Sequence, residues 1–318
     1  MMNASVGALY WQVQRRRNRG LIGLGLVVLG FLVLYVIQFP GLISIGGISK
    51  FTQNWFPLAL VTMAQVILML TGGISLAIGP LVSLGAVIAA TTMTGPLGVG
   101  GGFLAVCATG LAVGAVFGAV VTLVRLPAIV VTLAGSFILG GIALLILERP
   151  GGAMPVWLSD LLAGNTPTAL GLLILVLVGW KLYLKTPWGL GIYAAGENPV
   201  AAYRAGVPVH QVKIAAYAIS GLLTALAGLF VAAQTGSGDP VIGTPFTLNS
   251  IAAAVLGGAG FLGGVGTMRG ALLGSILLSV MINVMFFLGF PPVAQYVAQG
   301  LIIVGAVALP QLRVWRQR

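Results

Sequence analysis

The chain has 318 residues, of which 59% are hydrophobic and only 6% are charged, and its formal net charge is +11. A soluble domain carries about a quarter charged residues, so this composition excludes a water-soluble globular protein. The positive charge does not indicate nucleic-acid binding, because the basic residues are scattered over the termini and the ends of apolar runs, with one block at Arg15–Arg19. We attribute them to orientation in a lipid bilayer and to attraction by anionic headgroups.

Two long intervals of the chain carry no charge. No charged residue lies between Lys50 and Arg125, or between Arg269 and Arg313. A membrane-spanning helix needs roughly 20 mostly apolar residues, so the first interval has room for about three spans and the second for about two. The sequence therefore predicts an all-α polytopic membrane protein, with residues 1–318 forming a single transmembrane domain.

The N-terminal segment 1–20 ends in the basic block and is followed by an uncharged run from Leu21 to Ser49. A basic block before an apolar run can be a secretory signal peptide, but this run is long and lacks an obvious Ala-x-Ala cleavage site. We therefore expect a retained first span. The positive-inside rule then places residues 1–20 in the cytoplasm.

The apolar runs along the chain predict about ten transmembrane helices, which return the C-terminal tail, 311–318, to the cytoplasmic side. On this count most of the basic loop residues are cytoplasmic, and three of the four acidic residues lie outside. Lys50 and Arg149 are exceptions, because they also fall outside. The predicted spans are 21–39, 56–72, 75–93, 102–124, 127–147, 169–184, 213–234, 246–264, 270–289 and 293–310.

Eight polar residues fall within or beside these spans. Exposing such groups to lipid is costly, so each is expected either to form hydrogen bonds between helices or to line a polar passage for a solute. Both interpretations are open for any single residue, and we expect some of the set to line the passage. The candidates are Gln65, Thr71, Ser75, Thr132, Ser136, Asn249, Ser250 and Asn283.

A glycine-rich segment from Gly257 to Gly270 contains the G-x-G-x-x-G spacing of a dinucleotide-binding turn. Such a turn needs an acidic residue about 20 positions further on, but the last acidic residue of the chain is Asp239, which precedes the motif. No Gly-Lys pair occurs, which also argues against a P-loop. The four-residue spacing instead predicts close helix packing, with a helix break inside the segment. The expected packing glycines are Gly260, Gly264, Gly266, Gly270 and Gly274.

Residues for catalysis, metal binding or ion coupling are scarce in this chain. Cys107 and His210 are each the only residue of their type, and the predicted spans contain no Asp or Glu except Glu148 at an edge. A proton-driven carrier usually needs ionisable residues within its spans. We therefore expect no catalytic residue, no metal and no cofactor in this chain, and we expect a partner to supply the energy.

The longest polar stretch that the topology places in the cytoplasm is the loop 185–212. Asn198 and Pro199 suit the start of a helix, and Gly206 suits its end, which predicts a short helix over 199–205. A helix this short is not stable alone, so it either docks on a partner or packs within a structured loop. Small residues would permit entry into a cleft, and the charged residues would pair at its rim. The candidate contact residues are Glu197, Asn198, Pro199, Ala201, Ala202, Arg204 and Gly206.

Three stretches resemble the permease subunits of ribose-type sugar ABC importers, within the branched-chain amino acid/sugar permease superfamily. They are WGLGIYAAGENPVAAYRAGVPVHQVKIAAYAISGLLTALAGLF at 188–230, FTLNSIAAAVLGGAGFLGGVGTMRG at 246–270 and TGGISLAIGPLVSLGAVIAA at 71–90. The resemblance implies the ABC importer permease fold and assigns the loop 185–212 to coupling with the ATPase. Ser75 stands where the family commonly has Asp, which leaves open a pairing with a different permease.

The resemblance also implies partners and a location. The partners are a second permease subunit in a homo- or heterodimer, two cytoplasmic ATPase subunits that bind ATP and magnesium, and a periplasmic solute-binding protein. The location is the bacterial inner membrane. Spans almost without charge favour a small neutral solute, and we expect a monosaccharide. The alternatives are an ion-coupled secondary transporter, or an ABC permease for branched-chain amino acids or a sugar-like signalling molecule.

Overall fold

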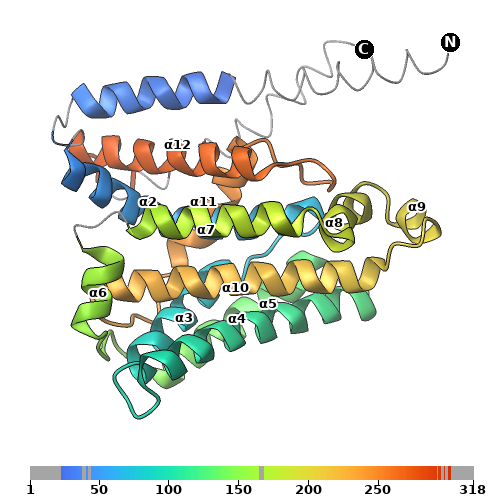
Figure 1. The fold of residues 1–318 in the computed structure, drawn as a ribbon, viewed down its shortest axis with the longest axis horizontal. Helices are drawn as coiled ribbons and strands as arrows, with labels where there is room; N and C mark the ends of the chain where they lie inside the picture. Colours follow the sequence, from blue (N-terminus) through green and yellow to red (C-terminus); the bar gives the residue numbers. More distant parts are fainter. Residues whose placement is uncertain are drawn as a thin grey trace.

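The chain forms a bundle of α-helices with two short helices, α8 and α9, at one end (Figure 1). The described residues contain no β-strand, only an isolated antiparallel bridge between Gly151 and Gly238. A helix over Gly23–Ile37 precedes the labelled elements. These are α2 (Ile45–Leu70), α3 (Ile78–Thr92), α4 (Gly98–Leu123), α5 (Ala128–Ile146), α6 (Val156–Ala163), α7 (Thr168–Tyr183), α8 (Pro187–Glu197), α9 (Pro199–Arg204), α10 (Val209–Thr235), α11 (Thr244–Leu256) and α12 (Met268–Phe287).

The structure is a computed structural model. The expectations for the segment 1–20, the tail 311–318 and most of the predicted span 293–310 fall outside the residues that it describes. The described residues are 23–37, 41, 44–164, 168–291, 293–294, 297 and 300–301.

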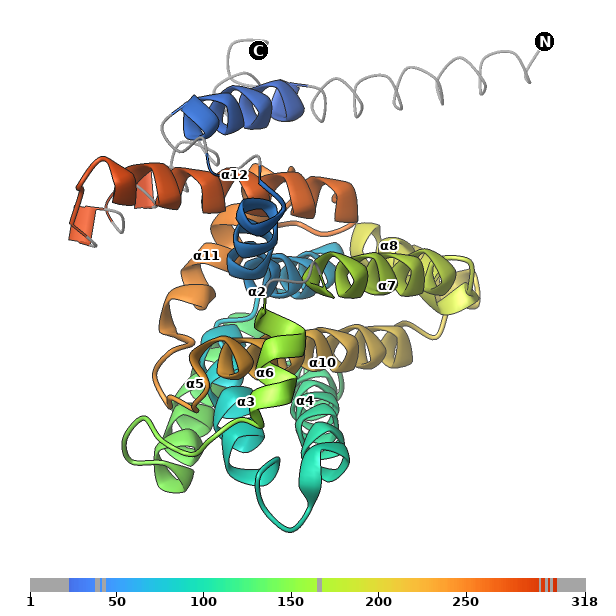
Figure 2. The same ribbon diagram turned by 60° about the vertical axis from the view of Figure 1, so that its left-hand side comes forward.

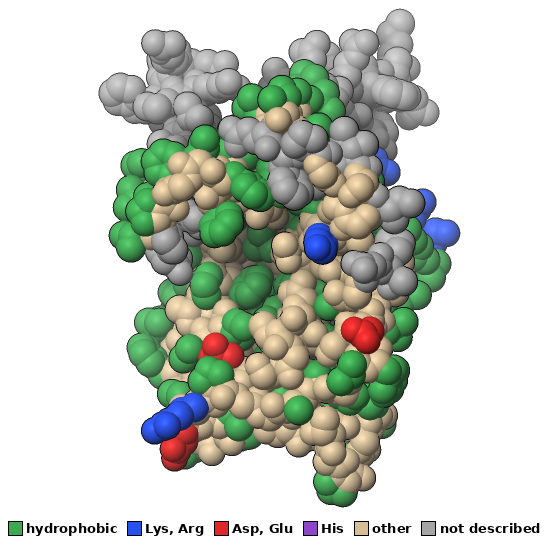
Figure 3. Space-filling view, turned by 90° about the vertical axis from the view of Figure 1, so that its left-hand side faces the viewer, with side chains coloured by type: hydrophobic (Ala, Val, Ile, Leu, Met, Phe, Trp, Pro, Cys, Tyr) green, Lys and Arg blue, Asp and Glu red, His purple; other side chains and the backbone are tan. Residues whose placement is uncertain are grey.

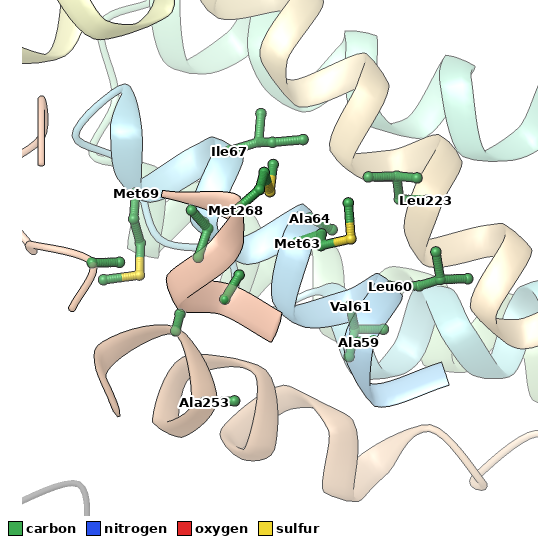
Figure 4. Packing of buried hydrophobic residues seen from close by; sticks show 14 of the residues in the cluster. Ala59, Leu60, Val61, Met63, Ala64, Ile67, Met69, Leu223, Ala253 and Met268 are labelled. Atoms are coloured by element: carbon green, nitrogen blue, oxygen red, sulfur yellow. The ribbon is translucent and has the colours of Figure 1, made fainter. Parts of the chain in front are cut away.

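The core lies around α2 and α10. In two views α12 lies on one side of the bundle, and α4 and α5 lie on the other (Figures 1 and 2). Almost every residue of α2 after Thr52 is buried. Its side chains, such as Met63, belong to one cluster with Leu223 of α10, Ala253 of α11 and Met268 of α12 (Figure 4). From Trp55 to Leu70, α2 carries only two polar residues, Thr62 and Gln65, as expected of a helix that is buried on all sides.

Glycines bring α4 into backbone contact with α10. Gly110, Gly114 and Gly118 are all buried on the same face of α4. A methyl group at Gly114 would collide with the carbonyl oxygen of Tyr217, and one at Gly118 would lie 2.8 Å from the Cα of Ile214. Small residues at four-residue spacing permit this approach in lipid. The sequence analysis did not single out this face.

The starts of α3 and α11 are held together by hydroxyl groups. The Gly79 amide near the start of α3 donates to Thr247 Oγ1 of α11 at 3.1 Å. In the opposite direction, the Gly243 amide before α11 donates to Ser83 Oγ of α3 at 2.9 Å. The first amides of a helix lack partners within it, so each helix supplies a hydroxyl acceptor for an amide at the start of the other.

Five described helices are long and apolar enough to cross a membrane, and α6 with α7 would make a sixth as one bent span. Three other apolar helices, Gly23–Ile37, α3 and α11, have between 10 and 17 described residues, fewer than the roughly 20 that a straight span needs. The described residues therefore support an all-α membrane protein, but they do not confirm about ten spans. The five long ones are Gly46–Leu70, Gly98–Leu123, Ala128–Ile146, Val209–Thr235 and Met268–Phe287.

Several predicted boundaries are wrong. α2 begins at Ile45 rather than at 56, since the Ser44 side chain accepts a hydrogen bond from the Gly47 amide and caps the helix there. The predicted span 246–264 is wrong in its second half, because α11 ends at Leu256 and Gly258 has a φ of 82°. The helices α6 and α8 were not predicted.

The two ends of the bundle differ in charge. Figure 3 shows the end that carries α6, where acidic side chains, in red, lie on the same face as basic side chains, in blue. Glu148 follows α5, Asp160 lies in α6 and Asp239 follows α10, and the basic exceptions Lys50 and Arg149 belong to the same end. This grouping matches the predicted grouping of the loops. At the other end, Arg125 and Lys185 lie in loops, Arg204 ends α9 and Arg269 lies in the first turn of α12.

Candidate functional site

The predicted short helix is present as α9, with the predicted start and stop. Asn198 Oδ1 accepts a hydrogen bond from the Ala201 amide at 3.0 Å, and Pro199 occupies the first turn. At the other end Gly206 has a φ of 83°, which a glycine adopts without steric cost. Its amide and the next one bond back to carbonyl groups of the last turn, each at 3.0 Å. The cap prediction is confirmed.

The two faces of α9 differ in exposure. Ala202 is 6% exposed and belongs to the main apolar cluster, whereas Val200 is 62% and Tyr203 is 69% exposed. The expectation that Ala202 enters a cleft of a partner is wrong for this conformation, because its methyl group already packs inside its own chain. The accessible face is formed by Val200, Tyr203 and Arg204, which lie on the same side because their spacing is one helical turn. Glu197 and Ala201 are also exposed.

Helix α8 precedes α9 and positions it. Thr186 accepts a hydrogen bond from the Gly189 amide at 3.2 Å and is followed by Pro187 in the first turn. Asn198 ends α8 and begins α9, so that no linker separates the two helices. The Thr-Pro pair is a helix-start signal that the sequence analysis did not use.

The predicted path residues fall into three groups. Thr71, Ser136 and Ser250 bond carbonyl groups within their own helices, and Asn283 is half-buried in α12. Ser75 lies in the break between α2 and α3, where its Oγ accepts from the Ala77 amide at 3.2 Å. Thr132 of α5 reaches the same break, and its Oγ1 accepts from the Leu76 amide at 3.1 Å. The third group consists of Gln65 and Asn249.

Gln65 and Asn249 are buried without complete hydrogen bonding. Gln65 is fully buried in α2, and neither its side-chain nitrogen nor its oxygen has a partner among the described residues. Asn249 of α11 is 8% exposed, and its Oδ1 is also unpaired. A buried polar group without a partner costs about 1–3 kcal/mol. Among the path candidates, these two residues therefore keep hydrogen-bonding capacity that the described residues do not use.

A small cavity lies between the helix break and α10. Its volume is about 10 Å³, close to the space that one water molecule needs. Tyr217, Ser220 and Thr224 of α10 line it together with Ser75. The Tyr217 hydroxyl is buried and unpaired. The sequence analysis missed these three α10 residues, although their spacing places them on a single helix face.

The packing glycines separate into a helical pair and a loop set. Gly270 and Gly274 face α11, where a methyl group at Gly274 would collide with the Ala253 carbonyl oxygen and lie 2.7 Å from the Gly257 nitrogen. The prediction of a shared helical face is wrong for Gly266, because α12 begins only at Met268. Gly260 and Gly264 also lie in the loop between α11 and α12 rather than on a helix.

The residues with the G-x-G-x-x-G spacing, from Gly258 to Gly263, also lie in this loop between α11 and α12. In this structure the segment follows the helix α11 rather than a strand, so it lacks the context of a dinucleotide-binding turn. Within the described residues no group of three His, Cys, Asp or Glu side chains is placed to hold a metal ion. Cys107 is a half-buried free thiol on α4, and His210 is exposed at the start of α10.

Comparison with known proteins identifies the family. The model described as branched-chain amino acid transport system / permease component matches residues 47–307. The chain belongs to this permease family. It is 31% identical over 325 residues to the galactose/methyl galactoside import permease protein of Escherichia coli strain K12, covering 93% of this permease and 95% of that protein.

Two further relatives are also named as permease proteins. The permease is 30% identical over 290 residues to the ribose import permease protein of Escherichia coli strain K12, covering 84% of this chain and 86% of the relative. It is 32% identical over 300 residues to a probable ABC transporter permease protein of Sinorhizobium fredii, covering 89% and 88%. No solved structure matches the permease. The resemblance to ribose-type ABC permeases is thus confirmed, and the permease is an integral membrane protein.

Proposed function

We propose that this permease forms the translocation path of an ATP-driven importer for a monosaccharide. One observation carries the proposal: two relatives that align over most of the chain are named for the import of galactose and of ribose. The nearly uncharged helices fit a neutral polyol better than a zwitterionic amino acid, because a charged group in the membrane interior is costly without a partner. The energy comes from separate ATPase subunits that bind ATP and magnesium, and no cofactor binds this chain.

The assembly contains further subunits besides this permease. A second permease, identical or related, completes the membrane core, two ATPase subunits lie in the cytoplasm, and a periplasmic binding protein delivers the sugar. The end with Arg125, Lys185, Arg204 and Arg269 faces the cytoplasm together with both termini, since cytoplasmic loops are enriched in Lys and Arg. The end shown in Figure 3 faces the periplasm and the binding protein.

The exposed face of α9 contacts the ATPase. Val200 and Tyr203 offer apolar area at a projecting helix, and Arg204 lies beside them. Interfaces commonly hold an aromatic residue at the centre and charges at the rim, which assigns Tyr203 the central position and Arg204 and Glu197 the rim.

The path contains the buried polar groups that lack partners in this conformation. Gln65, Asn249 and Tyr217 have donors or acceptors to offer to water or to sugar hydroxyl groups. A conformational change that opens the core would pair these groups. This state is therefore a closed one, in which their desolvation opposes the stability of the fold.

The test is uptake by proteoliposomes that contain the permease with its ATPase subunits and binding protein. We expect ATP on the side of the membrane that carries the ATPase subunits to drive uptake of labelled galactose or ribose. Ionophores that dissipate ion gradients should not change this uptake. Uptake of labelled leucine is measured in parallel as the test of an amino acid substrate. Uptake by the permease alone on an ion gradient would contradict the proposal in favour of a secondary transporter. ATP-driven uptake of leucine but of neither sugar would replace the substrate class.

A further inference from the structure

Three glycines join the end of α8 to the end of α2 and to the loop before α12. A methyl group at Gly196 in the last turn of α8 would collide with the Leu70 carbonyl oxygen and lie 2.7 Å from the Gly264 nitrogen. A methyl group at Gly263 would lie 2.6 Å from the Gly196 carbonyl oxygen and 3.1 Å from the Cα of Gly72. Backbone therefore touches backbone from three segments, and no side chain fits between them.

Hydrogen bonds and a further close contact reinforce this junction. The Gly264 amide donates to the Leu70 carbonyl oxygen at 2.9 Å. The Tyr193 hydroxyl of α8 donates to the Gly266 carbonyl oxygen at 3.4 Å. A methyl group at Gly264 would lie 2.9 Å from the Cβ of Glu197. The last turn of α8 is thus held to the glycine-rich loop by contacts on both sides of the Leu70 carbonyl.

The junction lies directly between α9 and the membrane helices. Asn198 caps both α8 and α9, so a displacement of α9 moves the last turn of α8. On the other side of the junction, the chain after Leu70 enters the break that leads to the cavity and to α3. The loop after Gly266 enters α12 through the Thr267 cap, which accepts from the Gly270 amide at 3.0 Å.

We propose that Gly196, Gly263 and Gly264 form a rigid joint that moves the end of α2 and the start of α12 together with α8. The joint has no compliant side chain, so a displacement received at α9 reaches both membrane segments without being absorbed. These glycines are positioning residues for transport, because they act through α2 and α12 and contact no solute. The inference rests on the proposed function, since it takes the ATPase as the source of the displacement.

Spin labels measure whether the joint is rigid without altering it. Cys107 is the only cysteine, so Cys107→Ala provides the background. One pair combines Leu190→Cys on α8 with Arg269→Cys on α12, across the joint. The other combines Leu190→Cys with Phe137→Cys on α5, away from it; all three positions are exposed. The labelled permease is mixed with an excess of unlabelled copies, so that one subunit of a dimer carries both labels.

We expect the Leu190–Arg269 distance to stay constant between the nucleotide-free and ATP-bound transporter, while the Leu190–Phe137 distance changes. A change at Leu190–Arg269 as large as that at Leu190–Phe137 overturns the proposal. Constant distances in both pairs, in a transporter that imports sugar, overturn it as well. Absence of ATP-driven uptake by the unlabelled transporter would instead refute the proposed function.

A substitution then tests the consequence for transport. Gly196→Ala inserts a methyl group into the joint, and its matched control is Gly179→Ala in α7, where a methyl group meets nothing within 4 Å. We expect Gly196→Ala to retain its ATPase subunits and hydrolysis but to import about tenfold less sugar per ATP, the size of a typical coupling between sites. A merely structural defect would lower ATPase assembly and transport together. An unchanged ratio of sugar to ATP in a folded Gly196→Ala transporter overturns the proposal, and if this variant does not fold, the distance measurement decides.

Discussion

The α4–α10 contact and the joint at the end of α8 both depend on glycine, but they differ in backbone geometry. In α4 the glycines lie one turn apart on a continuous helix and face the backbone of α10. In the joint, Gly263 and Gly264 lie in a loop with φ values of 92° and 71° and touch two other chain segments. The first arrangement stabilises two antiparallel helices that lie side by side, whereas the second fixes the relative position of three element ends. Glycine content alone therefore does not reveal which task a segment performs.

The largest effect is expected where glycine allows two long helices, α4 and α10, to touch. Gly114→Leu places a side chain where the Tyr217 carbonyl oxygen lies, so α4 and α10 cannot approach. Overpacking costs typically 1–3 kcal/mol and can cost more, so we expect a loss of stability of about 3 kcal/mol or more. Yield and thermal unfolding in detergent measure it. Gly140→Leu in α5 is the control, because that position has open space; equal stability of the two variants would contradict the α4–α10 contact.

A smaller effect is expected at the buried face of α9. Ala202→Trp cannot fit into the apolar cluster, so α9 should leave its position at a cost of about 2 kcal/mol. We expect faster proteolysis around residues 198–207 with the membrane helices intact. Ala201→Trp on the exposed side is the control, and it should leave proteolysis unchanged. Equal protection of both variants would mean that α9 is not held by Ala202.

The exposed face of α9 should affect binding but not stability. Tyr203→Ala removes an aromatic side chain that is 69% exposed, and we expect ATPase association to weaken by roughly tenfold or more, as for an interface anchor. Unfolding should stay unchanged. Trp157→Ala, a similarly exposed aromatic residue on α6 at the other end, is the control. Weakened association in both variants, or in neither, would remove Tyr203 from the contact.

A substitution in the path should change stability little, and any change should be favourable. Gln65→Met removes an unpaired buried amide while keeping the side-chain length, so the variant should be as stable as the natural protein or up to about 2 kcal/mol more stable. Sugar uptake should slow, because the path loses a hydrogen-bonding group. Gln53→Met on the same helix is the matched control and should lose stability, since Gln53 Nε2 donates to Ser49 Oγ at 3.1 Å. Destabilisation of Gln65→Met would show that its amide is paired in the protein.

Sequence reasoning succeeded where structure is set by neighbouring residues. The start and stop of α9 follow from Asn198, Pro199 and Gly206, each acting within one turn of the chain. The membrane class followed from composition and the family from three motifs. Burial of Ala202 could not be derived in this way, because it depends on α8, which was not predicted, and on the packing of that helix on the core.

Contacts between distant segments limited the rest. The spacing of Gly266, Gly270 and Gly274 suggested one face, but Thr267 caps α12 and leaves Gly266 outside it. The unpaired hydroxyl of Tyr217 follows from the arrangement of α10 against the helix break, which no local pattern encodes. Signals for α8, and for the glycine face of α4, were present in the chain at Thr186-Pro187 and at Gly110 to Gly118.

The hydrogen bond from the Leu76 amide to Thr132 decides which substitutions position 132 tolerates. Thr132 Oγ1 replaces the carbonyl group that a continuous helix would have supplied at the break, and the apolar surroundings offer few other acceptors. Valine has nearly the same shape as threonine and is more hydrophobic, yet it would leave that amide without an acceptor, whereas serine would keep one. A saturation library at position 132 should therefore rank serine above valine, the reverse of a hydropathy scale, and the same inversion is expected at Thr247 and Ser83.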